Sequence, residues 1–172
     1  DSELNINNGT YLQMLTQIGR EGYGSDIDFA KAVVEATLIR TFNNVHRITI
    51  RGEAGVIKTN SFDEVPTSLR FYAGGDKSVR GFDYREISPT AEVIDPETGE
   101  LIVDSIGGKY LATSSVEYAY QVADNWRVAA FVDAGTATND TSTTLTYSVG
   151  PGVHWLSPIG PVRLYVARGF AP

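Results

Sequence analysis

The sequence predicts an all-β protein built as an antiparallel meander. Seven segments alternate apolar and polar residues with a period of two, which is the pattern of strands with one apolar and one polar face. Most of these segments are longer than ten residues, whereas strands in globular proteins average about 5–6 residues. Residues 60–108 interrupt the series, and no segment carries a convincing helical stripe. We therefore expect about seven long strands and one long loop.

The first three predicted strands cover residues 11–23, 28–41 and 46–59. The first follows a turn-like Asn-Asn-Gly sequence, and the third alternates most plainly between apolar and charged residues. The second has a helical alternative, because its first half reads Phe-Ala-Lys-Ala-Val-Val-Glu-Ala. Its Val- and Thr-rich continuation and the neighbouring strands favour a strand.

The last four predicted strands cover residues 110–122, 125–135, 144–156 and 162–169. Each again sets apolar residues against polar ones, and only Ala123-Asp124 separates the first from the second, as in a hairpin. Glu117 and Asp133 fall on the polar faces of these two strands. Both carboxylates are therefore expected to point to the same side of the sheet.

The loop at 60–108 is too long for an ordinary connection, and structureless loops of that length are usually functional. Residues 95–99, Asp-Pro-Glu-Thr-Gly, predict a turn inside a small hairpin. The loop tip, residues 68–84, reads SLRFYAGGDKSVRGFDY and combines three glycines with the arginine at position 80. Since glycine permits positive φ and close backbone approach, we expect this tip to fold back into a barrel.

Alternation is compatible with two settings. In a soluble sandwich or barrel the apolar face points inward, whereas in an outer-membrane barrel it faces lipid and the polar face lines a wet lumen. Segment length, and the glycines and charges on one face, favour a barrel in outer-membrane lipid whose lumen receives the loop. Aromatic residues near strand ends fit an interfacial belt: Tyr110, Tyr118, Tyr120, Trp126 and Trp155. The alternative is a soluble β-barrel ligand-binding module.

Composition limits the partners and the chemistry. The 172 residues include 14 Lys and Arg against 21 Asp and Glu, and this net charge of -7 argues against nucleic acid as a partner. The absence of cysteine removes disulfides, thiol catalysis and cysteine metal sites. His46 and His154 have no closely spaced second ligand, so we expect ordinary strand residues. No nucleophile elbow or phosphate loop is present. We expect no cofactor, no metal and no covalent catalysis.

Arg80 is the residue of the loop tip with the most specific structural requirement. Carried into a lumen it needs carboxylate partners, because an unpaired buried charge is costly. We therefore predict that Arg80 contacts Glu117, Asp133 or both, with bidentate geometry where the positions permit it. Phe82 is expected to pack beside Arg80. The alternative is a solvated arginine on an exposed loop.

Four sequence motifs together resemble one family. Residues 65–82, which end in Val-Arg-Gly-Phe, resemble the VRGF loop, the sixth extracellular loop of the outer-membrane assembly and two-partner secretion transporter superfamily. LATSSVEYAY (111–120), FVDAG (131–135) and GPGVHWLSPIGPVR (150–163) resemble the strands that follow that loop. Within the superfamily the chain is most similar to TamA, the barrel subunit of the translocation and assembly module.

The resemblance implies a sixteen-stranded antiparallel transmembrane β-barrel preceded by periplasmic POTRA domains. The 172 residues would then form one domain, an incomplete barrel corresponding to strands nine to fifteen, without the aromatic-ended last strand of the family. The resemblance also implies a lumen-docked latch, with Glu117 and Asp133 as its receptors. Its residues would be Asp76, Val79, Arg80, Gly81 and Phe82.

The function implied by the resemblance is outer-membrane protein assembly. The protein would promote insertion or translocation of β-barrel and autotransporter substrates, with a periplasm-spanning TamB-like partner. A two-partner secretion pore is the alternative within the same superfamily, because such pores share the loop motif.

Overall fold

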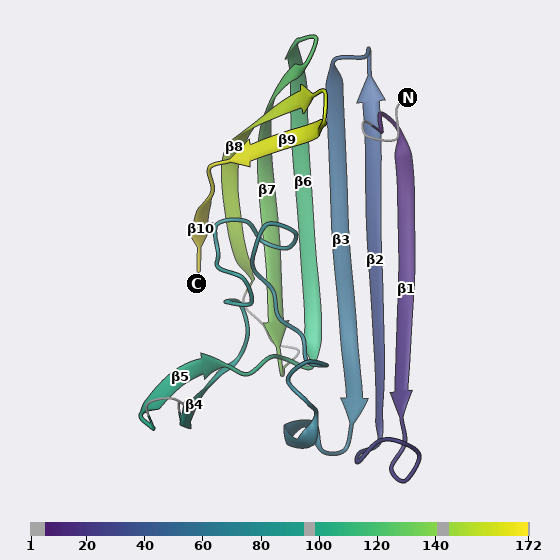
Figure 1. The fold of residues 1–172 in the computed structure, drawn as a ribbon, viewed down its shortest axis with the longest axis vertical. Coiled ribbons are helices and arrows are strands. Elements are labelled where there is room, and N and C mark those ends of the chain that lie inside the picture. Colours follow the sequence, from purple (N-terminus) through teal and green to yellow (C-terminus); the bar gives the residue numbers. More distant parts are fainter. Residues whose placement is uncertain (1–5, 95–98, 141–144, 172) are drawn as a thin grey trace.

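The computed structural model describes residues 6–94, 99–140 and 145–171, and within these ranges it is built of strands. One eight-stranded antiparallel sheet has the order β1-β2-β3-β6-β7-β8, with β9 and β10 both paired to β8, and β4 and β5 form a separate hairpin (Figure 1). The described residues contain no α-helix and a single 3₁₀ turn at Phe62–Glu64. None of their helices is long and apolar enough to cross a membrane. The predicted all-β antiparallel fold is confirmed.

The strands have the following bounds: β1 Gly9–Gly19, β2 Phe29–Phe42, β3 His46–Thr59, β4 Thr90–Ile94, β5 Leu101–Ser105, β6 Tyr110–Ala123, β7 Trp126–Thr138, β8 Thr146–Ser157, β9 Gly160–Tyr165 and β10 Arg168–Phe170. β2 pairs with β3 from Phe29 to Phe42, so the helical alternative for this segment is wrong. β4 and β5 flank the turn predicted at 95–99, of which residues 95–98 lie outside the described residues. Residue 144, the predicted start of another strand, also lies outside them.

The predicted strand 162–169 is interrupted at residues 166 and 167, between β9 and β10. Two other strands end well away from their predicted ends, for local reasons. β1 ends at Gly19, four residues before position 23, because the chain turns there: Gly22 and Gly24 have φ of 79° and 83°, and the Tyr23 amide donates to the Arg20 carbonyl at 3.0 Å. β7 continues to Thr138, beyond position 135, because Thr138 pairs with Tyr110 at the start of β6.

The two faces of the sheet have inverted burial. On β7, Val128 and Val132 are 45% and 53% exposed, whereas Arg127 and Asp133 are 5% and 0% exposed. Trp126 and Trp155 stack at 5.8 Å on the exposed outer face, near the end of β7 and β8 remote from the loop. A soluble barrel would bury the apolar face, so this arrangement is that of a sheet whose outer face meets lipid.

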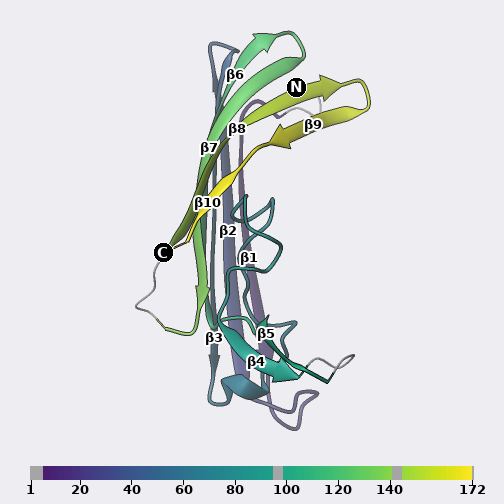
Figure 2. The same cartoon turned by 90° about the vertical axis from the view of Figure 1, so that its left-hand side faces the viewer.

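The long loop covers the other, inner face of the sheet. It leaves β3, runs along the side toward which the sheet curves, and returns to β6 (Figure 2). Its base packs into an apolar cluster with the adjoining strand ends: Ile27, Ile57, Phe62, Val65, Phe71, Ala73, Leu111 and Ala137. Burial of this cluster fixes where the loop enters the inner side.

Arg70 fastens the loop base by hydrogen bonds to backbone carbonyls. Its guanidinium donates to the carbonyls of Val65 at 2.8 Å, Asp63 at 2.8 Å and Ile106 at 3.2 Å, and it lies 4.8 Å from the centre of the Phe62 ring. These carbonyls belong to the outgoing and the returning arm of the loop. Arg70 therefore joins the two arms and directs the loop tip toward the strands beyond.

Candidate functional site

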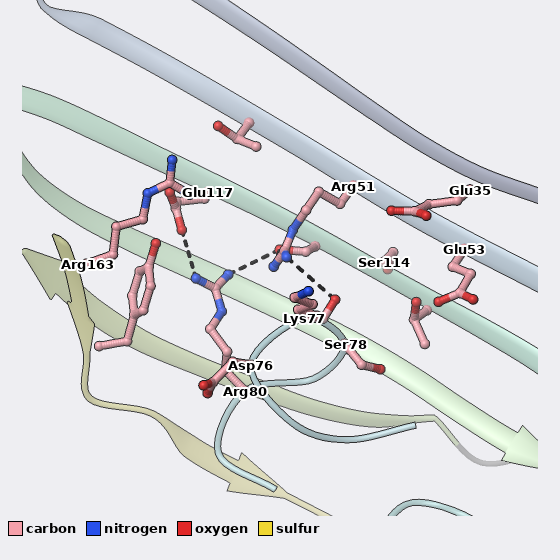
Figure 3. A pocket seen from close by; sticks show the side chains of 15 residues that line it. Glu35, Arg51, Glu53, Asp76, Lys77, Ser78, Arg80, Ser114, Glu117 and Arg163 are labelled. Carbon is pink, nitrogen blue, oxygen red and sulfur yellow. Dashed lines mark hydrogen bonds and ion pairs between the residues drawn. The ribbon is translucent and has the colours of Figure 1, made fainter. Parts of the chain in front are cut away.

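The candidate site is the contact between the loop tip and the inner face of β6 and β7. Arg80 Nε and Nη2 donate to the two carboxylate oxygens of Asp133 at 2.7 and 2.8 Å, which is a bidentate pair. Nη1 donates to Glu117 at 2.7 Å (Figure 3), and Nη2 donates also to Ser115 Oγ at 3.1 Å. The Arg80 backbone amide donates to Asp133 at 3.1 Å. Arg80 thus contacts both carboxylates that lie on the polar strand faces.

Strand register brings these receptors together. Ser115 of β6 pairs with Asp133 of β7, and Asp133 pairs with Ser148 of β8, so the three side chains form one row across the inner face. Glu117 lies two residues along β6 and pairs with Phe131. Because side chains two residues apart share a face, both carboxylates point to the loop.

Arg80 is almost completely buried, at 3% exposure, and its charge is offset by its surroundings. Its guanidinium carbon lies 3.6 Å from the centre of the Phe131 ring and 4.5 Å from that of Tyr165, both favourable cation–π distances. Burial opposes the charged form, but the hydrogen bonds to Asp133 and Glu117 outweigh it, so the pKa of Arg80 lies above its ordinary value. Arg80 remains a cation at any physiological pH.

Glycines on the inner face provide the room for the apolar side chains of the loop. A Cβ atom built on Gly135 of β7 would lie 2.7 Å from Val79 Cγ2, and one on Gly169 of β10 would lie 2.5 Å from the Phe82 ring. These distances are shorter than real contacts allow, so a side chain at either position would displace Val79 or Phe82. Phe131 and Tyr165 lie against the Arg80 guanidinium, and the Phe82 ring lies over Gly169.

The remaining predicted residues have different positions. Gly81 has φ of 85°, and a Cβ on it would lie 3.0 Å from Ala167 Cβ, so it combines a left-handed backbone with close approach. Val79 is fully buried. Asp76 is exposed and lines a cavity beside the tip, which Arg80 and Glu117 also line. Four of the five predicted loop residues, Val79 to Phe82, thus contact the strands directly, and Asp76 borders the cavity beside them.

A polar cavity of about 450 Å³ adjoins the site on the β2–β3 side. Arg51 donates to Ser115 Oγ at 3.2 Å, and Glu35 and Glu53, which pair across β2 and β3, also line the cavity (Figure 3). Within the described ranges, no group of three or more His, Asp or Glu side chains is arranged to hold a metal ion. The charged and polar side chains of the inner face are thus suited to holding the loop tip.

Sequence reasoning missed several contributors. Tyr165 and Ser115 were visible as polar-face residues, but their contact with Arg80 depends on the path of the loop. His154, expected to be an ordinary strand residue, is buried and has Nε2 2.9 Å from the Tyr165 hydroxyl and 3.5 Å from Glu117. Apolar residues at polar-face positions near the loop, such as Leu111, were the available signal for the cluster at the loop base.

Known proteins with similar sequences are described as outer membrane protein assembly factor BamA. The protein from Nitratidesulfovibrio vulgaris is 33% identical over 177 residues, which are 99% of this chain and 21% of that protein. The protein from Neisseria meningitidis is 29% identical over 178 residues, covering 84% and 22%. That from Neorickettsia risticii is 30% identical over 160 residues, covering 86% and 20%. The chain thus spans about a fifth of the length of these relatives.

The fold is also that of a known barrel. The crystal structure of BamA from Haemophilus ducreyi lacking POTRA domains 1–3 superposes with a TM-score of 0.80 at 23% identity, covering 99% of this chain and 37% of that one. These similarities and the apolar outer face locate the chain in the bacterial outer membrane. Residues 1–171 match the Omp85 superfamily domain. The chain therefore belongs to the Omp85 superfamily.

Proposed function

We propose that the chain is the loop-bearing part of an outer-membrane protein assembly factor, which promotes insertion or translocation of β-barrel substrates. The observation that carries the proposal is the buried contact of Arg80 with Glu117 and Asp133 inside a sheet whose outer face is apolar. The names of the BamA relatives support the same function.

The docked loop tip serves this function as a brace, and residues Val79–Phe82 are accordingly called the latch. An assembly factor that offers a strand edge to its substrate works by β-augmentation, so it must open at one place while the rest of its wall keeps its shape. Arg80 bridges β6 and β7, and Gly81 and Phe82 extend the contact to β10. The latch thereby holds adjoining strands in one arrangement, and the process requires no covalent chemistry.

A narrower version of the proposal is a TamA-type role, with autotransporter substrates and a periplasm-spanning TamB-like partner. The similarity of the loop and strand motifs to TamA supports it, whereas the BamA relatives support a general assembly role. Co-purification of the full-length protein from its native membrane distinguishes the two, because only the TamA-type role retains a TamB-like partner.

The test is substrate assembly by the full-length protein carrying Arg80→Ala. Cells that depend on this copy are expected to accumulate unfolded barrel substrate, measured by the heat-modifiable gel mobility of newly made outer-membrane proteins. Arg20→Ala is the matched control, because Arg20 is exposed in the β1–β2 turn. Normal substrate folding with the Arg80 variant, at wild-type abundance of the factor, would contradict the proposal. Secretion of one dedicated partner, with barrel assembly unaffected, would instead identify a two-partner secretion pore.

A further inference from the structure

β9 and β10 are two pieces of a single strand interrupted at Val166 and Ala167. Tyr165 of β9 pairs with Gly152, and Arg168 of β10 pairs with Val149. The two partners are three positions apart on each strand, so the register is the same on both sides of the interruption and no residue is inserted. The interruption, called the strand break below, is thus a local departure of the backbone from the ladder.

The Gly150-Pro151-Gly152 sequence of β8 explains the strand break. The Val166 amide donates to the Pro151 carbonyl at 3.0 Å, but Pro151 has no N–H group to donate back to the Val166 carbonyl. That carbonyl oxygen occupies the space where a Cβ of Gly150 would lie, which only glycine permits. The return hydrogen bond is thus lost at Pro151, and the flanking glycine accommodates the displaced backbone.

The strand break lies directly under the latch. Gly81 approaches Ala167, and its built Cβ would lie 3.3 Å from the Gly169 amide nitrogen, while the Phe82 ring covers Gly169. On the other side of the break, the Tyr165 ring lies over Gly152, whose built Cβ would be 2.5 Å from it. The same ring contacts the Arg80 guanidinium. Residues on both sides of the break therefore contact the latch.

Apart from the latch, β10 is held by its pairing with β8 and by the Phe170 ring, which stacks on Tyr147 with ring centres 5.0 Å apart. It pairs with β8 through three residues, Arg168 to Phe170, and its inner-face residue Gly169 has no side chain of its own to pack. A three-residue strand next to a missing ladder hydrogen bond is weak by itself. The Phe82 ring supplies the apolar cover on the inner face of this strand, where Gly169 has no side chain.

We propose that the broken strand β9–β10 is a third receptor of the latch, and that latch docking and the pairing of β9–β10 with β8 stabilise each other. Tyr165 and Gly169 act as positioning residues on either side of the break. Because coupling between two sites is reciprocal, release of the latch loosens β9–β10, and disruption of the seat on β10 loosens the latch. The functional consequence rests on the proposed assembly function: latch release would free β9–β10 from the barrel wall.

Hydrogen exchange of the full-length protein in detergent micelles tests the coupling in both directions. With Arg80→Ala, we expect the amides of residues 164–170 to exchange about tenfold faster, while β2 and β3 keep their rates. With Gly169→Ala, we expect about tenfold faster exchange at residues 78–82, because the added methyl group displaces Phe82. Gly52→Ala is the matched control, since its nearest neighbour, the Thr113 carbonyl oxygen, would be 3.7 Å away.

Unchanged exchange at 164–170 after latch release, or unchanged exchange at 78–82 in Gly169→Ala, would overturn the inference. A second measurement avoids dependence on these variants: Phe82→Ala removes the ring that covers Gly169 and changes neither Arg80 nor any residue of β9–β10. This variant is expected to speed exchange at 164–170, and an unaltered rate there would count equally against the coupling. If coupling is found but Arg80→Ala leaves substrate folding intact, the inference stands and the proposed function fails.

Discussion

Asp133 and Glu117 both bind Arg80, but the structure assigns them unequal shares of the interaction. Asp133 accepts three hydrogen bonds from Arg80, two from the guanidinium at 2.7 and 2.8 Å and one from the backbone amide at 3.1 Å. Glu117 accepts one, at 2.7 Å. Asp133 is fully buried, whereas the side chain of Glu117 is 10% exposed. Neutralising Asp133 should therefore weaken latch docking more than neutralising Glu117.

The magnitudes follow from the contacts that each substitution removes. Asp133→Asn breaks the bidentate pair and turns an amide N–H toward a guanidinium N–H, so we expect a loss of ~3–5 kcal/mol in the free energy of latch docking. Glu117→Gln removes the charge from one hydrogen bond, for which we expect a loss of ~1.5–3 kcal/mol. Asp76→Asn, in the same loop tip but exposed, should change docking by less than ~0.5 kcal/mol.

The assay is native-state hydrogen exchange at residues 78–82 of the full-length protein, which reports the free energy of latch opening. A double-mutant cycle adds a stricter test: with Arg80→Ala already present, Asp133→Asn should cost little or stabilise, because the buried carboxylate has lost its cation. A cost for Glu117→Gln equal to that for Asp133→Asn would refute the reasoning. Additive effects of Arg80→Ala and Asp133→Asn would refute it as well.

Three further outcomes are expected. Gly135→Val fills the space of Val79 and should weaken latch docking by ~1–3 kcal/mol in the same exchange assay, while a matched Gly52→Val, with its neighbour at 3.7 Å, should have a smaller effect. Arg70→Ala removes the donors to three backbone carbonyls and should make the loop base susceptible to trypsin, while the gel mobility of the folded barrel stays unchanged. Digestion at the wild-type rate would contradict this prediction. Ser148→Ala should be neutral or slightly stabilising in thermal unfolding, because the buried Ser148 hydroxyl has no hydrogen-bond partner among the described residues.

Much of the fold could be predicted because a strand's period of two assigns each side chain to a face. That rule placed Glu117 and Asp133 on the side that the loop occupies, and Arg80 does lie between them. The period-two rule needs no knowledge of distances, because strand register and pleat place both carboxylates on the inner face of the sheet.

What could not be predicted depends on the path of the backbone. The aromatic neighbours of Arg80 could not be chosen from sequence, because Tyr165 reaches it only through the curvature of the sheet and the room left at Gly152. Arg70 binds carbonyls, which every residue carries, so its partners had no sequence signal. The strand break is caused by Pro151 of β8 but occurs in the neighbouring strand. The alternation of residues within one strand cannot predict it.

The latch precedes all of its receptors in the sequence. Arg80 is followed 37 residues later by Glu117 and 53 residues later by Asp133, and Gly169, which seats Phe82, comes later still. During synthesis the loop tip therefore exists before any of its receptors, and such long-range contacts form slowly. Docking has to wait until β6, β7 and β10 are aligned beside one another. A docked Arg80 therefore reports that β6 and β7 are already aligned beside each other.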